Sequence, residues 1–161
     1  MILASDWNTS GRDDIIYLKD RIDNPPRARL SHSTTQSLTS GADTALAWDS
    51  EADDSAALHD TSTNNSRITI PTGEGGWWLF SAAVEFTAHA SGERKLSLRV
   101  GGSSDYAYEA VGAAASGVTR LGVTAHLALA AGQYVEVIAA QNSGGALTVT
   151  TTRAFMAVRV A

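Results

Sequence analysis

The 161-residue chain contains no cysteine, which excludes disulfide bonds and thiolate metal ligands. Charged residues make up only 18% of the chain and the formal net charge is −5, a balance that argues against binding to nucleic acid. No apolar run approaches the ~20 residues that a transmembrane helix needs, so we expect no membrane insertion. The first ten residues, MILASDWNTS, lack a basic segment followed by an apolar one, and they predict no signal peptide.

Motifs for catalysis and for cofactor binding are also missing. The four histidines, at positions 32, 59, 89 and 126, show no metal-ligand spacing, and no serine lies in a G-x-S-x-G context. We therefore expect no enzymatic activity, no catalytic residues, no metal site and no cofactor. The acidic stretch 49–65 does not match the calcium-loop pattern. It predicts a solvated loop, although a cation site within 49–60 stays open as an alternative.

Period-two alternation of apolar and polar residues is the main pattern that is present. It is clearest in residues 121–141, LGVTAHLALAAGQYVEVIAAQ, where two alternating runs flank a turn at Gly132. We expect these runs to form a hairpin-like pair of strands. Residues 77–87 form the longest predicted strand, with one face made by five residues: Trp78, Phe80, Ala82, Val84 and Phe86.

The whole pattern gives nine or ten short strands separated by glycine-rich turns, with no helices between them. This arrangement predicts an all-β antiparallel sandwich or jelly roll over residues 27–161. Strands around Trp77, Leu127 and Phe155 carry apolar or small residues on both faces. Because the outer face of a two-layer sandwich is normally polar, we expect a second buried surface in a closed homo-oligomer.

Residues 1–26 follow a different period and predict a short N-terminal helix. Ile15, Leu18 and Ile22 form one apolar stripe, and Pro25-Pro26 ends the helix. Two alternatives remain open: a surface helix packed on its own domain, or a helix that meets its copies or a docking partner.

Three sequence blocks resemble the C1q/TNF-like family. ITIPTGEGGWWLFSAAVEF resembles its strand–proline–turn–aromatic strand block, LALAAGQYVEVIAAQNSGG its paired strands around a glycine turn, and FMAVRVA its closing strand. The match covers about residues 28–161 with the blocks in order. It implies a ten-strand antiparallel jelly-roll sandwich that forms a homotrimer around its inner sheet. The residues that we assign to the trimer interface or core are Trp77, Leu79, His126, Phe155 and Ala157.

A narrower resemblance concerns the leader and the segment LHDTSTNNSRITIP, which look like virion structural proteins of tailed phages of actinobacterial hosts. It implies a non-enzymatic appendage of the tail fibre, tip or baseplate, assembled in the host cytoplasm and located in the virion. The expected virion anchor, toward other virion proteins, comprises Trp7, Ile15, Leu18 and Ile22. The expected surface for a host glycan comprises Arg99, Asp105, Tyr106 and Tyr108.

Two other functions stay open from the sequence. The chain could instead be a trimeric capsid-decoration protein, with the leader docked on the shell, or a soluble carbohydrate-binding module.

Overall fold

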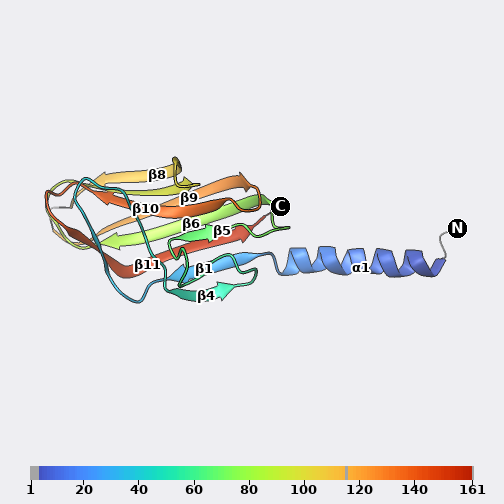
Figure 1. Ribbon diagram of the computed structural model, residues 1–161. Helices are drawn as coiled ribbons and strands as arrows, with labels where there is room; N and C mark the ends of the chain where they lie inside the picture. The colour runs from blue at the N-terminus through green and yellow to red at the C-terminus, as the bar shows by residue number, and fades with distance from the viewer. Residues whose placement is uncertain (1–3, 115, 161) are drawn as a thin grey trace.

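The computed structural model describes residues 4–114 and 116–160. Two antiparallel sheets pack face to face, and one long helix projects from an end of this sandwich (Figure 1). The all-β antiparallel sandwich predicted from the sequence is confirmed. Eleven strands lie within the described residues, one more than the ten that the family resemblance implies.

The first sheet, which we call sheet A, contains six strands. Its central path runs β4 (Ser50–Asp54), β1 (Arg27–Ser31), β11 (Leu147–Arg159), β6 (Gly76–Phe86) and β9 (Thr119–Leu129). The short strand β2 (Gln36–Leu38) also pairs with β11. Every pairing in the sheet is antiparallel.

The second sheet, sheet B, contains five strands. Its path runs β3 (Thr44–Ala45), β10 (Tyr134–Gln141), β7 (Glu93–Val100) and β8 (Ser104–Gly112), and β5 (Arg67–Thr69) also pairs with β10.

The core between the sheets is aromatic at its centre. The ring centroid of Phe155 lies 5.6 Å from that of Trp48 and 6.2 Å from that of Phe80. The predicted alternation of β6 is confirmed, because alternate side chains from Trp78 to Phe86 are buried. Burial of these large side chains supplies the main free energy that holds the two sheets together.

The predicted hairpin over residues 121–141 is wrong. β9 pairs with β6 in sheet A, whereas β10 pairs with β7 in sheet B, so the two runs lie in opposite sheets. The turn between them crosses the sandwich. Gly132 adopts φ +83° there and donates its N–H to the carbonyl of Ile70 at 2.8 Å. The alternation itself was read correctly, because both strands bury their apolar faces in the shared core.

The expected solvated loop over residues 49–65 is also partly wrong, because Ser50–Asp54 forms the edge strand β4. The carboxylate of Asp54 then accepts the backbone N–H of Ala56 at 3.3 Å and those of Leu58 and His59 at 2.9 Å. This acidic side chain therefore shapes a turn, in which Ala57 takes φ +52°.

The leader forms the helix α1 (Ala4–Asp23), which extends away from the sandwich in line with β1, at the end where β11 terminates (Figure 1). Arg21 ties the helix to the sandwich, since its Nη1 lies 2.6 Å from Oε2 of Glu74. Within the described residues, α1 is the single helix, and no helix is long and apolar enough to cross a membrane.

Candidate functional site

The outer face of sheet A carries large apolar side chains that no part of the described chain covers. We call this surface the outer apolar face and define it by Trp77, Leu79, His126, Met156 and Val158. Trp77 is 47% exposed, Met156 42% and Leu79 39%. Each residue alternates with a buried neighbour along β6, β9 or β11, so the strand period places it on the side opposite the core.

The register of sheet A brings these residues into one cluster. Leu79 is the cross-strand partner of Val158 on one side and of His126 on the other. The indole of Trp77 packs against the imidazole of His126, with ring centroids 4.8 Å apart. Residues from three strands therefore form a continuous apolar surface.

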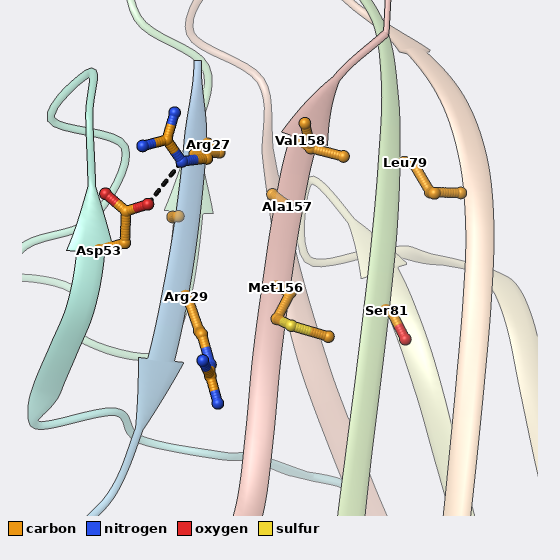
Figure 2. Close-up of a pocket in the computed structure, with 9 residues that line it drawn as sticks. Arg27, Arg29, Asp53, Leu79, Ser81, Met156, Ala157 and Val158 are labelled. Carbon is orange, nitrogen blue, oxygen red and sulfur yellow. Dashed lines mark hydrogen bonds and ion pairs between the residues drawn. The ribbon is translucent and has the colours of Figure 1, made fainter. Parts of the chain in front are cut away.

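A shallow pocket of about 250 Å³ lies beside this cluster. Met156, Val158, Leu79 and other side chains of β1, β11 and β6 line it, as Figure 2 shows. Arg27 and Asp53 close its edge, with 2.5 Å between Arg27 Nε and Asp53 Oδ2. The pocket contains no nucleophile paired with a base. Its chemistry suits apolar contact, with one ion pair available to fix orientation.

The side chains at the other end of the same face are small and polar. Ser81 accepts a hydrogen bond from Thr124 at 3.3 Å, and Gly122 lies opposite Ala83 two pairs further along the register, on the same face. Beyond these residues on β6 and β9, Arg120 and Glu85 form an ion pair at 2.6 Å. Small side chains allow another backbone to approach this end closely.

The five residues predicted for the trimer interface or core divide into two groups. Trp77, Leu79 and His126 lie on the outer apolar face, whereas Phe155 and Ala157 lie inside the sandwich and are buried. Of the two roles predicted for Phe155 and Ala157, their burial fits the core role and not the interface role. Their neighbours Met156 and Val158 take the outer positions, because alternate residues of β11 point to opposite sides.

The predicted glycan surface lies on sheet B, in the other layer of the sandwich. Tyr106 and Tyr108 are 61% and 69% exposed on the edge strand β8. Asp105 joins two cations, with Arg99 Nε at 2.7 Å and Lys95 Nζ at 2.8 Å. Burial opposes ionisation of Asp105, but the hydrogen bonds from Arg99 and Lys95 outweigh it and lower the carboxyl pKa. The four predicted residues thus form a charged network beside two exposed aromatic rings.

The predicted anchor residues Ile15, Leu18 and Ile22 are exposed on α1. The side chain of Trp7 lies outside the part of the chain whose side chains the structure describes.

Metal binding has no geometric support in residues 4–114 and 116–160, where no three histidine or acidic side chains form a group that could hold an ion. In the acidic segment the side chains contact protein partners instead. His59 Nδ1 lies 2.8 Å from Glu51, and Asp60 accepts hydrogen bonds from Ser62 and Thr63.

No protein family matches the chain, and a comparison with curated proteins found no relative. Solved structures do match the fold. The Eiger TNF protein of S. frugiperda is 15% identical, with a TM-score of 0.63 over 86% of this chain and 94% of that one. Murine APRIL is 10% identical, with a TM-score of 0.67 over 85% of this chain and 100% of that one.

The globular domain of zebrafish complement 1qA is 12% identical, with a TM-score of 0.55 over 84% of this chain and 98% of that one. The chain therefore has the TNF/C1q-like jelly-roll fold that the sequence resemblance predicted.

Proposed function

We propose that this chain is a non-enzymatic structural protein that assembles as a homotrimer through the outer face of sheet A. The observation that carries the proposal is the outer apolar face. Large exposed apolar patches are unusual on monomers and mark interaction surfaces. The outer face of sheet B forms a contrast, because Lys95, Arg99 and Asp105 cover part of it with ion pairs.

A closed trimer accounts for the arrangement of the face. Its large residues and its small residues occupy opposite ends of β6 and β9, so copies related by rotation can approach closely at one end and bury rings at the other. The Arg27–Asp53 and Glu85–Arg120 pairs lie at the margins, as charges do at the rims of interfaces.

The trimer is tested by measuring mass with light scattering at micromolar concentration. The intact chain should have the mass of three copies. Trp77→Asp should give a folded monomer, because it replaces a large apolar side chain of the interface with a carboxylate that loses its hydration when the copies associate. Tyr108→Asp, a matched change of an exposed aromatic on sheet B, should stay trimeric. A wild-type monomer would refute the proposal.

The biological setting that we propose is a bacteriophage virion, where the trimer serves as a tail appendage with α1 directed toward the particle. Support comes from the sequence resemblance of the leader and head, and from the projection of α1 away from the sandwich at one end (Figure 1). The opposite end of the head and the outer face of sheet B are then free to contact a host surface. Capsid decoration is the competing location.

Removal of residues 1–26 tests the role of the leader. The truncated chain should remain a trimer in solution but should no longer join the particle. Immunogold labelling of purified virions that carry the full-length chain would show whether the protein lies on the tail or on the capsid. Incorporation of the truncated chain at the wild-type copy number would contradict the proposed role.

A further inference from the structure

The apolar stripe of α1 is mostly uncovered by the described residues. Ile15, Leu18 and Ile22 are 67%, 58% and 78% exposed, although they lie on one side of the helix. Their spacing of three and then four residues corresponds to positions a, d and a of a heptad repeat. A 20-residue helix with so thin a stripe is marginal in water unless another surface covers it.

The C-terminal end of the stripe lies beside the sandwich. Where α1 meets the sandwich, a hollow of about 190 Å³ is lined by apolar and basic side chains: Leu18, Arg21, Ile22, Pro25, Pro26, Arg159 and Val160. Val160 in turn donates its N–H to the carbonyl of Trp77 at 2.8 Å. The C-terminal end of the stripe therefore lies beside the strand end that pairs with Trp77, with Arg21 and Arg159 between the two apolar surfaces.

The charges beside the stripe suit a second copy of the same helix. With Ile15 at position a, Asp14 occupies position g and Lys19 the following position e. In a parallel, in-register coiled coil, position g of one helix faces the following position e of its neighbour. Asp14 of one copy would thus face Lys19 of another, and the two charges are opposite.

We propose that α1 packs against the same helix of the other copies as a short parallel coiled coil continuous with the trimeric head. This proposal rests on the homotrimer proposed above. Isoleucine at a with leucine at d favours two strands when a helix is free to choose, so the head sets the number of strands. It also holds the helices close together, which raises their effective concentration and compensates for the thin stripe.

Site-specific crosslinking tests the helix contact directly, because the chain has no cysteine of its own. Gly11→Cys places a thiol at position d and leaves the stripe intact. Asp13→Cys places one at position f, on the side away from the neighbours. Under mild oxidation at micromolar concentration, Gly11→Cys should form a disulfide-linked dimer rapidly, and Asp13→Cys should form it many times more slowly.

A second pair of variants tests packing without oxidation. A Cβ added at Gly11 meets no atom within 4 Å in the single chain. Gly11→Ala and Gly11→Leu raise helix propensity to similar extents, but only leucine would fill position d of a coiled coil. Gly11→Leu should raise the melting temperature of the helical circular-dichroism signal by several degrees above that of Gly11→Ala.

Each outcome has one meaning. The coiled coil would be ruled out if the chain is trimeric but Gly11→Cys and Asp13→Cys crosslink at equal rates and Gly11→Ala and Gly11→Leu have equal melting temperatures. The proposed function would then remain intact. A monomeric wild-type chain would refute the proposed function itself. Equal crosslinking in the free trimer, combined with protection of Gly11→Cys from a maleimide in virions, would assign the stripe to another virion protein instead.

Discussion

Phe155 and Met156 are adjacent on β11 and point to opposite sides of sheet A. Phe155→Ala should lower the free energy of unfolding by about 3–5 kcal/mol, because it removes a ring from the packed core. Met156→Ala should change it by no more than about 0.5 kcal/mol, as expected for an exposed position. Urea denaturation of the monomeric Trp77→Asp background isolates both effects from trimer assembly. Equal losses would contradict the assignment of Phe155 to the core.

Arg153 is a buried cation without a full set of partners. Its Nη1 donates to Gln36 at 3.2 Å and its guanidinium lies 5.6 Å from the ring centroid of Trp48. Within the described chain its Nε and Nη2 have no hydrogen-bond partner, and burial lowers the pKa of Arg153 to about 10. The charge of Arg153 affects the pKa of nearby His32. Burial first, and then the charge of Arg153, lower the His32 pKa below 6.5, while Asp49 opposes the shift.

The His32 shift has a defined sign for stability. Because the unfolded chain binds the proton more tightly than the folded one, the stability that His32 contributes is present above pH 6.5. It is lost as the pH falls through 6.5 toward the folded pKa. Arg153→Met should raise the His32 pKa, as followed by NMR titration, and weaken this acid sensitivity. An unchanged His32 pKa would show that Arg153 does not act on it.

At the scale of elements, β4 and the turn after it depend on one carboxylate. Asp54→Ala should lower the free energy of unfolding by about 1–3 kcal/mol, because three buried or half-buried N–H groups lose their acceptor. EDTA should leave the melting temperature unchanged, since the acidic side chains already have protein partners. A fall in melting temperature with EDTA that calcium reverses would show that an ion stabilises this segment.

Strand alternation was readable from the sequence wherever a strand buries one face, as in β6 and β9. The connection between β9 and β10 was not, because a glycine turn can join strands of one sheet or of two. β4 was missed because its residues, Ser50–Asp54, are polar on both sides of an edge strand. The period-two pattern also did not show which face of β11 points into the core, since Phe155 and Met156 are both apolar.

The candidate site could be predicted in part for the same reason. Trp77, Leu79 and His126 followed from alternation along two strands. The Arg27–Asp53 pair joins residues from two strands that come together only when β1 and β4 pair, and nothing in the local sequence indicates that contact.

At the scale of the whole molecule, a trimer would carry three copies of the exposed pair Tyr106 and Tyr108. If these rings contact a host surface, three linked sites bind far more tightly than one. Tyr106→Ala with Tyr108→Ala should therefore abolish binding to host cells and leave the trimer intact. Trp77→Asp should also weaken binding strongly, although its tyrosines are unchanged. Both results are measured by a cell-binding assay with labelled protein, and normal binding by the double variant would assign contact to another surface.

The in-line arrangement of α1 and β1 has a mechanical consequence (Figure 1). If the leader tethers the head as proposed, a pull on the head is transmitted directly along β1. Hydrogen bonds join β1 to β4 on one side and to β11 on the other, and in antiparallel pairs these bonds lie perpendicular to the strands. The load therefore acts in shear on all of them at once, instead of opening them one by one. A sideways pull on the tether would instead load the Arg21–Glu74 contact, which ties the helix to the sandwich.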